Sequence, residues 1–345
     1  INKRLVRLLS ALDAIIIDEV SMVRADVLDA IDYSLKLHRK SVAPFGGVQM
    51  LFFGDLFQLP PVVSSQEERE YFRTAYPSPY FFDAHIFKSH VHLVMIELTR
   101  VYRQRERNFI QLLDAIRTMQ FDYEELDSLN ERYLPDEPIE EPYLTLCSTN
   151  AAAQQINKDR LALLTTPSFY YSGEVKGDFN PKLFPTDYKL ELRLDGQVML
   201  IRNDPEKRFV NGSLARIVGL EEEKIIVSMT SDGGKSEVFE LPKMTWEVNK
   251  YTLSTDTDNP IKAEVIGSFI QYPVRLAWAV TIHKSQGKTY ERVAIDLGRG
   301  AFEHGQTYVA LSRCTSLNGV FLKKPLTPRD IMVDERVAEF YETMR

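Results

Sequence analysis

The strongest constraint on the fold is the stretch Val274–Tyr290, VRLAWAVTIHKSQGKTY, taken together with GQTYVALSRC at Gly305–Cys314. In the first stretch an apolar run ends in a polar loop that carries a cation and a Gly. The second stretch predicts a helix-like segment that presents a Ser-Arg pair. Strands that deliver polar loops at their ends are typical of α/β sheets, in which functional groups gather outside the carboxyl ends of the strands.

The first part of the chain alternates helix and strand in the same way. Ala14–Ile17 and Val48–Phe53 are apolar runs suited to buried parallel strands. Ile1–Leu12 predicts an amphipathic helix, and a second helix stripe lies between the strands, at Val23, Val27, Ile31 and Leu35. The sequence has no G-x-x-x-x-G-K-[ST] phosphate loop, so we expect that the chain opens in the middle of its first domain.

Composition narrows the class of protein. With 345 residues, 44% of them hydrophobic and 26% charged, the chain has room for two or three globular domains. No apolar run approaches the roughly 20 residues of a membrane span, so we expect no membrane partner. Cys147 and Cys314 are far apart and predict neither a metal site nor a disulfide framework. The net charge of −7 disfavours a protein that coats nucleic acid but permits one that binds a single strand in a locally basic channel.

The middle of the chain predicts a second α/β region with a β-rich insertion. The acidic, proline-rich Pro135–Pro142 is the best linker candidate. Leu144–Leu161 then predicts a strand, a loop and a helix, and we expect its asparagines, Asn150 and Asn157, to act as helix caps. Residues 206–264 predict β-hairpins separated by turns. The α/β pattern returns afterwards, with strands predicted at Leu276–Ile282 and Val293–Leu297.

Asp18 and Glu19 follow the first predicted strand directly. At the carboxyl end of a parallel strand an Asp can hold Mg²⁺, and a neighbouring Glu can polarise water. An apolar strand followed by two acidic residues is also commonplace, so this pair alone leaves a purely structural role open.

Three further segments offer groups that bind phosphate or nucleic acid. Gln58, in the turn after Gly54 and Asp55, can sense a γ-phosphate, although the segment also fits a plain proline-rich turn. Arg103, in LTRVYRQ, can point at a transferring phosphoryl group or lie on a helix surface, and Arg313 is a second such candidate. The remaining segment, TIHKSQG, combines a cation with hydroxyl and amide donors that suit a nucleic-acid backbone: His283, Lys284, Ser285 and Gln286.

In this order and spacing, the segments resemble a superfamily-1 DNA helicase of the 5′-to-3′ branch, more narrowly the Pif-type (petite-integration-frequency) helicases, with RecD-like helicases as near kin. The matching segments run from Asp18 to Cys314: DEVSM, GDLFQLPPV, LTRVYRQ, LCSTNAAAQQIN, FVNGSLARIVG, AWAVTIHKSQG and GQTYVALSRC. The resemblance implies an α/β fold of two RecA-like P-loop NTPase motor domains, with a small SH3-like β-barrel inserted in the second. By this resemblance residues 1–136 form the first domain, which lacks its phosphate-loop segment. Residues 137–205 and 265–345 form the second domain, and residues 206–264 form the insertion.

The resemblance also implies roles for individual residues. Asp18 would be the Mg²⁺-associated carboxylate and Glu19 the general base. Gln58 would sense the γ-phosphate, with Arg103 and Arg313 completing the ATP site. Residues near the nucleotide would be Gly54, Asp55, Gln286 and Gly287, and residues on the DNA side would be His283, Lys284 and Ser285.

The implied ligands are ATP and Mg²⁺, and the implied partners are single-stranded DNA and forked or structured DNA. The resemblance predicts a monomer or a transient dimer on DNA, cytoplasmic or nucleoid-associated, in settings such as DNA repair, recombination or telomere maintenance. Without a phosphate loop, this chain alone is expected to bind ATP poorly. Two alternatives stay open: a non-catalytic piece that binds or regulates single-stranded nucleic acid, and the helicase part of a nuclease or relaxase complex.

Overall fold

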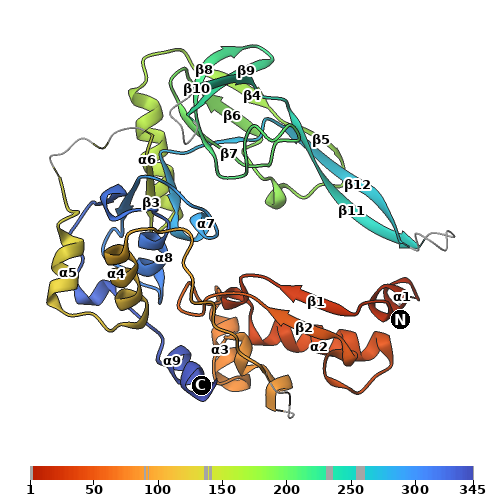
Figure 1. Cartoon of the computed structure of the whole chain (residues 1–345). Helices are drawn as coiled ribbons and strands as arrows, with labels where there is room; N and C mark the ends of the chain where they lie inside the picture. The colour runs from red at the N-terminus through yellow and green to blue at the C-terminus, as the bar shows by residue number, and fades with distance from the viewer. Residues whose placement is uncertain are drawn as a thin grey trace. The chain divides into compact units, whose positions relative to one another are not determined.

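The computed structural model describes residues 3–88, 91, 93–135, 139, 142–230, 236–253 and 261–344. The chain falls into two compact units, and Figure 1 labels their helices and strands. Unit 1 contains residues 1–134, 253–261 and 299–345, and unit 2 contains residues 135–252 and 262–298. The predicted boundary between residues 136 and 137, and most of the predicted linker around it, lies outside the described residues.

In unit 1, two short parallel strands form where the apolar runs predicted them. β1 (Ala14–Ile17) pairs with β2 (Gln49–Phe52), and Ile15 lies opposite Met50. The helix between them is α2 (Ala25–Arg39), which runs beside the strands in Figure 1. The stripe at every fourth residue predicted this helix because such positions share one helix face.

The prediction that both strands are buried was wrong. Within the described residues β1 and β2 pair only with each other, and their side chains alternate between exposed and half-buried. Ile15 and Phe52 pack on the core, whereas Ile16 on the opposite face is 65% exposed. Successive strand residues point to opposite faces, so a sheet covered on one face buries only alternate residues, however apolar the run.

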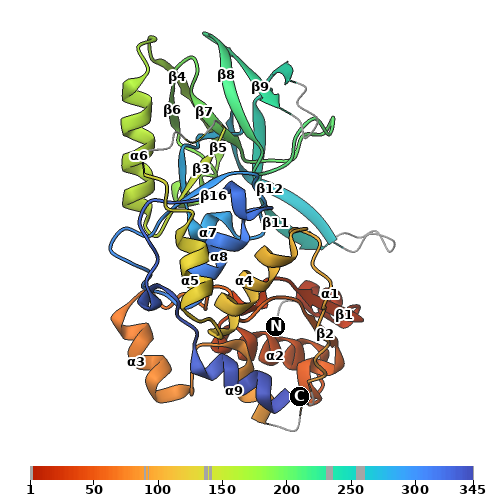
Figure 2. The same ribbon diagram turned by 60° about the vertical axis from the view of Figure 1, so that its left-hand side comes forward.

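An aromatic core holds unit 1 together and includes α9 (Glu335–Met344) (Figure 2). The rings of Phe82 and Phe340 stack with centroids 4.3 Å apart, and Arg336 on α9 forms an ion pair with Asp83. Stacked aromatic pairs add stabilisation beyond the burial of their surface, so these contacts anchor α9 to the core. The other helices and strands of unit 1 are α1 (Lys3–Ser10), α3 (Gln66–Ala75), α4 (Arg107–Thr118), α5 (Tyr123–Asn130), α8 (Gln306–Ser312) and β16 (Val320–Leu322).

In unit 2, β3 (Leu144–Cys147) lies between β14 (Ala279–Thr281) and β15 (Val293–Asp296), and both neighbours run parallel to it. The strand predicted at Leu276–Ile282 was wrong in its extent. The apolar run is divided between β13 (Val274–Leu276), which pairs antiparallel with β7 (Gln197–Leu200), and β14. Every residue of both strands is buried or half-buried, so hydrophobicity alone could not reveal where the chain leaves one sheet and enters another.

The helix after β3 corrects the predicted caps. In α6 (Asn150–Leu163) the N-cap is Thr149, whose hydroxyl accepts a hydrogen bond from the Ala152 N–H. The Asn157 amide donates to the Ala279 carbonyl (2.8 Å) and accepts from the Ala279 N–H (2.9 Å). Asn157 therefore fixes α6 to the backbone of β14 instead of capping a helix.

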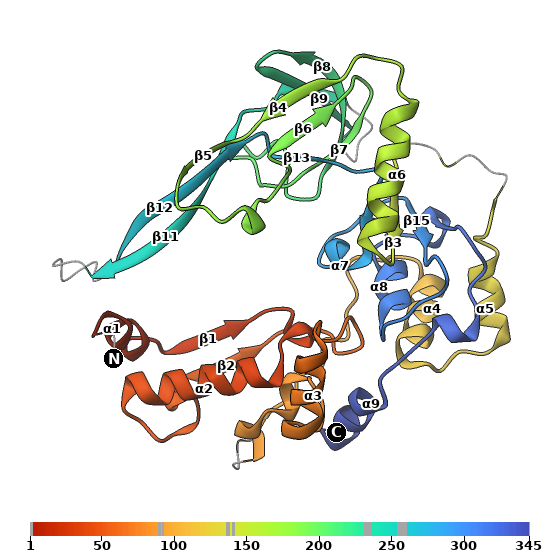
Figure 3. The same ribbon diagram turned by 180° about the vertical axis from the view of Figure 1, so that it is seen from behind.

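The β-rich part of unit 2 extends on both sides of residues 206–264. One sheet has the strand order β10-β9-β8-β7-β13. A second sheet has the order β11-β12-β5, and its long strands β11 and β12 are labelled in Figure 3. The SH3-like character of residues 206–264 stays a prediction. The strands not yet bounded are β4 (Phe169–Ser172), β5 (Glu174–Gly177), β6 (Lys189–Leu192), β8 (Leu214–Glu221), β9 (Lys224–Thr230), β10 (Ser236–Glu240), β11 (Met244–Leu253) and β12 (Ile261–Gln271).

The described helices include none that is both long and apolar enough to cross a membrane. Cys147 and Cys314 are buried and free of disulfides. Burial raises the pKa of the Cys147 thiol to about 12, so this thiol stays protonated and unreactive at neutral pH.

Candidate functional site

The turns that follow β1 and β2 lie against each other in unit 1. Asp18 is exposed at the carboxyl end of β1, and its Oδ1 accepts a hydrogen bond from the Glu19 N–H (2.9 Å). The Val20 N–H donates to the Phe53 carbonyl (2.9 Å), and a Cβ on Gly54 would lie 2.9 Å from the Val20 nitrogen. The absence of a side chain at Gly54 therefore allows the close approach that joins the two turns.

Glu19 has a left-handed backbone conformation, with φ 49° and ψ 46°. For a residue other than glycine this conformation costs free energy, and such residues gather at functional sites where the surroundings hold them. The N–H bond to Asp18 and the buried Val20 supply that constraint. Glu19 is thus fixed at a strand end, where the sequence predicted a general base.

Gln58 lies in a tight turn that begins at Asp55. The Gln58 N–H donates to the Asp55 carbonyl (3.0 Å), and the Phe57 N–H donates to the Asp55 carboxylate (3.2 Å). Gly305, the N-cap of α8, has φ 70°, and a Cβ there would lie 2.4 Å from the Phe57 carbonyl oxygen. The start of α8 therefore packs directly on the backbone of the turn that carries Gln58.

Arg103 reaches the other end of α8. Its guanidinium donates to the Ser312 carbonyl (3.2 Å), and the neighbouring Gln104 amide donates to the carbonyls of Ser312 (3.1 Å) and Cys314 (2.8 Å). Burial lowers the pKa of Arg103, an effect opposed by Tyr308 and by Glu19. Arg103 thus lies within electrostatic range of the predicted general base, which the separation of these residues in the sequence could not reveal.

Arg313 follows α8 directly and is only 1% exposed. Its Nε donates to the Val309 carbonyl (3.0 Å), and its Nη2 donates to the Ser312 hydroxyl (2.8 Å). A buried arginine held by such bonds is pre-oriented, because the guanidinium has a planar fork of donors. Its predicted role at a phosphate stays a prediction.

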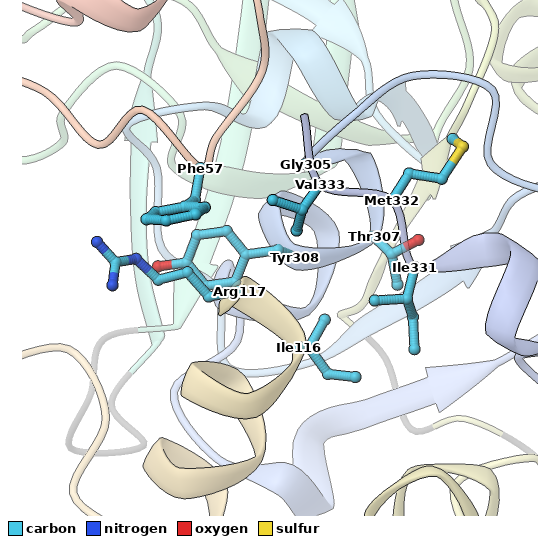
Figure 4. A pocket seen from close by; sticks show the side chains of 9 residues that line it. All are labelled: Phe57, Ile116, Arg117, Gly305, Thr307, Tyr308, Ile331, Met332 and Val333. Carbon is cyan, nitrogen blue, oxygen red and sulfur yellow. The ribbon is translucent and has the colours of Figure 1, made fainter. Parts of the chain in front are cut away.

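Asp55 faces two residues that the sequence analysis did not single out, Arg117 on α4 and Tyr308 on α8. The Tyr308 hydroxyl donates to Oδ2 of Asp55 (3.0 Å), and the Arg117 Nε lies 3.2 and 3.3 Å from the two carboxylate oxygens. Figure 4 shows Arg117, Tyr308 and Phe57 side by side along one side of a pocket. The apolar spacing on α4 predicts a helix but not this arginine's partner.

The donor set at the end of β1 fits a magnesium ion bound together with a nucleotide. Among the described residues no group of three or more His, Cys, Asp or Glu side chains could hold a metal ion alone. Mg²⁺ is usually bound by one or two carboxylates, by phosphate oxygens of the substrate and by water. Asp18, an exposed carboxylate at a strand end, is suited to be the protein's ligand in such a site.

Unit 2 carries the segment predicted to contact DNA, and its conformation differs from the expected loop. Residues Ile282–Ser285 form a one-turn helix, α7, which Thr281 caps by accepting a hydrogen bond from the Lys284 N–H. Lys284 is exposed and His283 is half-buried, whereas Ser285 is buried and its hydroxyl donates to the Ile282 carbonyl (2.7 Å). The bend that follows uses Gly287 with φ 73°, next to Gln286.

Two more cations, Arg275 and Lys288, accompany Lys284. The Lys288 ammonium lies 3.4 Å from Oδ1 of Asn211 and 3.6 Å from the sulfur of Met199, the residue opposite Arg275 in the β7–β13 pair. Burial, and then the charge of Arg275, lower the pKa values of both lysines. Arg275 lies in an apolar run and Lys288 just beyond the predicted polar loop, so neither gave a signal in the sequence.

Comparison of the sequence and comparison of the structure with known proteins both find Pif1 helicases. The sequence profile of the PIF1-like helicase family matches residues 2–125. The human ATP-dependent DNA helicase PIF1 is 33% identical over 96% of this chain and 49% of its own length. The Campylobacter jejuni ATP-dependent DNA helicase Pif1 is 30% identical over 98% of this chain and 77% of its own length. The chain thus spans about half the length of the human relative.

Solved structures agree. Bacteroides Pif1 in complex with ADP-AlF4 is 38% identical, with a TM-score of 0.84 over 98% of this chain and 76% of that one. Bacteroides Pif1 bound to single-stranded DNA matches with a TM-score of 0.71 at 39% identity, over the same shares of the two chains. The predicted α/β fold of two RecA-like domains and the predicted family resemblance are confirmed. The roles assigned to individual residues stay predictions.

Proposed function

We propose that this chain, which belongs to the PIF1-like helicase family, is part of an ATP-dependent 5′-to-3′ DNA helicase. The observation that supports the proposal is the close approach of the turns after β1 and β2, because Asp18 and Glu19 lie on one turn and Gln58 follows the other. Arg103 adds a cation within electrostatic range of Glu19. These are the groups that ATP hydrolysis needs: a carboxylate for Mg²⁺, a base for water, an amide for the γ-phosphate and a cation for the developing charge. A protein that only bound nucleic acid would need none of them.

In this mechanism each side chain has one task. Mg²⁺, held by Asp18 and the phosphates, would neutralise charge on the nucleotide. The Glu19 carboxylate orients the attacking water and accepts its proton as the general base. The fixed backbone of Glu19 holds this carboxylate at the strand end. Gln58 contacts the γ-phosphate, and Arg103 and Arg313 stabilise the negative charge that spreads over the transferring phosphoryl group.

The proposed nucleic-acid partner is single-stranded DNA next to a duplex or another folded structure. Lys284 and His283 would contact backbone phosphates, and such contacts carry no sequence preference. Related structures include Bacteroides Pif1 bound to single-stranded DNA and one titled for unwinding of forked double-stranded DNA by two coordinating Pif1 helicases. We therefore propose a monomer that can act in pairs at a fork, in the cytoplasm or at the nucleoid.

The direct test uses the protein at its full natural length, with partial duplexes that carry either a 5′ or a 3′ single-stranded overhang. We expect ATP-dependent strand separation of the 5′-overhang substrate and little of the 3′-overhang substrate. Salt-sensitive single-strand binding that ATP never changes, without strand separation, would instead support a passive binding protein.

The cation group in unit 2 yields a separate prediction. Replacing Lys288 or Arg275 with Gln should weaken single-strand binding and lower the slope of log K against log salt by about 0.7 per lost phosphate contact. The measurement is fluorescence anisotropy with a labelled oligonucleotide over a salt series. Lys224→Gln is the matched control, because Lys224 pairs with Glu240 elsewhere in the same unit. If the slope of log K against log salt were unchanged in both Lys288→Gln and Arg275→Gln, these two cations would not contact the DNA.

A further inference from the structure

The carboxylate of Asp55 is engaged on both oxygens by groups from three segments of unit 1. Oδ1 accepts from the Phe57 N–H (3.2 Å) and the Arg117 Nε (3.2 Å), and Oδ2 accepts from the Tyr308 hydroxyl (3.0 Å). The Asp55 side chain is only 20% exposed. These bonds engage both carboxylate oxygens within unit 1, and the place near the nucleotide that the resemblance implies for Asp55 stays a prediction.

Aromatic contacts extend this arrangement. The Arg117 guanidinium lies 4.6 Å from the centroid of the Phe57 ring, and Phe57 stacks on Tyr341 of α9 with centroids 4.9 Å apart. Figure 4 shows the Arg117 and Phe57 side chains near the hydroxyl end of the Tyr308 ring. A cation over an aromatic face and a stacked ring pair both restrict rotation, so Arg117 has little freedom to leave Asp55.

Tyr308 is chemically suited to its place as a hydrogen-bond donor. Burial, and then the charge of Asp55, raise the pKa of Tyr308 well above its ordinary value. The phenol therefore keeps its proton throughout the neutral range. For Arg117, burial has the largest single effect and would lower the pKa, but Asp55, Tyr308 and Tyr341 together outweigh it and the pKa is raised. A neutral donor and a cation thus hold one carboxylate.

The position of this contact connects the two parts of the site that sense phosphate. Asp55 begins the turn whose N–H bond fixes Gln58, and Tyr308 lies on the short helix that ends at Arg313. The backbone of the Gln58 turn also packs on Gly305 at the start of that helix. A shift of Tyr308 or Arg117 would consequently change the spacing between Gln58 and Arg313.

We propose that Asp55, Tyr308 and Arg117 form a positioning triad that holds Gln58 in register with Arg313 and Arg103 for ATP hydrolysis. The proposal rests on the proposed function, since it assigns these residues to alignment of the same site. The three side chains bond one another, so they act on the reaction only by positioning Gln58, Arg313 and Arg103 and are not catalytic residues. Misplacement of catalytic groups by about 1 Å can cost up to roughly 100-fold in rate, so alignment alone can have a large effect.

The test is Tyr308→Phe in the full-length protein, which removes one hydroxyl and keeps the ring. We expect the single-strand-stimulated kcat for ATP hydrolysis to fall about ten-fold, with KM for ATP and single-strand affinity changed less than about two-fold. Arg117→Gln should give a similar fall. The double variant should lose little more than the stronger single variant, because residues that act as one unit are not additive.

Tyr80→Phe is the matched control. The Tyr80 hydroxyl donates to the Asp334 carboxylate (3.2 Å), so this substitution also removes a buried tyrosine–aspartate bond from unit 1 but leaves the bonds to Asp55 in place. We expect it to lower Tm without lowering kcat. If Tyr308→Phe lowered Tm as Tyr80→Phe does and left kcat unchanged, the contact would be structural only and the triad would be refuted.

The two proposals fail in distinguishable ways. A wild-type protein that hydrolyses ATP with single-strand stimulation, together with a Tyr308→Phe variant of equal kcat, would refute the triad and leave the proposed function standing. A wild-type protein without ATP hydrolysis would refute both proposals. If Tyr308→Phe and Tyr80→Phe lowered kcat equally, the triad would also be refuted. The fall in kcat would then not depend on the bond between Tyr308 and Asp55.

Discussion

Replacing Glu19 with Gln is expected to lower single-strand-stimulated ATP hydrolysis by at least about 100-fold, the lower end of what a positioned general base contributes. Gln is nearly isosteric with Glu but cannot take a proton from water. The backbone of Glu19 is fixed by the turn itself, so the substitution should leave the site's geometry intact. ATP affinity and single-strand affinity should therefore stay close to those of the wild-type protein.

The measurement is steady-state phosphate release with and without single-stranded DNA, paired with binding of a non-hydrolysable ATP analogue. Glu70→Gln on α3 is the matched control, since the Glu70 carboxylate is exposed and pairs with Arg73 on the surface. Wild-type turnover in Glu19→Gln would show that another group activates the water. An equal loss of analogue binding and turnover would instead indicate a structural role for Glu19.

Replacing Arg103 with Gln is expected to lower kcat by about 1,000-fold, the smaller of the effects seen for arginines that stabilise phosphoryl transfer. Arg103 lies within electrostatic range of Glu19, and its guanidinium is held by the carbonyl at the end of α8. KM for ATP should change far less than kcat, because the developing charge exists only in the transition state.

The control for Arg103 is Arg132→Gln. Arg132 also donates to backbone carbonyls of unit 1, those of Val320 (2.9 Å) and Asn318 (2.9 Å), which follow α8 in the chain. Arg103→Lys is the second variant, because it keeps the charge and loses the planar fork of donors. If Arg103→Gln and Arg132→Gln reduced kcat equally, the contribution of Arg103 would be that of a structural arginine and its predicted role would be wrong.

Much of the fold was predictable because its signals are local. β1 has the bounds predicted from its apolar run, and α8 lies within the helix-like segment predicted at Gly305–Cys314. A helix stripe or an apolar strand is encoded by residues a few positions apart, and turn residues such as Gly54 mark where it ends. The same locality explains the wrong boundary at Leu276–Ile282, where one apolar run serves two sheets.

The candidate site was predictable only as a set of separate segments. The order of DEVSM, GDLFQLPPV and YVALSR allowed Asp18, Glu19, Gln58 and Arg313 to be named without any contact between them. Nothing local distinguishes Arg117 from other arginines on amphipathic helices, or Tyr308 from a core tyrosine. The bonds that engage Asp55 join residues separated by 62 and 253 positions, a distance that no periodicity spans.

By itself, the sequence determined the family, several of the helices and strands and the chemical types available at the strand ends, because these follow from neighbours along the chain. Only the tertiary structure decided which of those groups meet. It brought Arg103 into electrostatic range of Glu19, joined Asp55 to Tyr308 by a hydrogen bond and left one face of β1 exposed. The physical reason is that burial, charge pairing and hydrogen bonds depend on distance in space, which chain folding sets independently of separation in sequence.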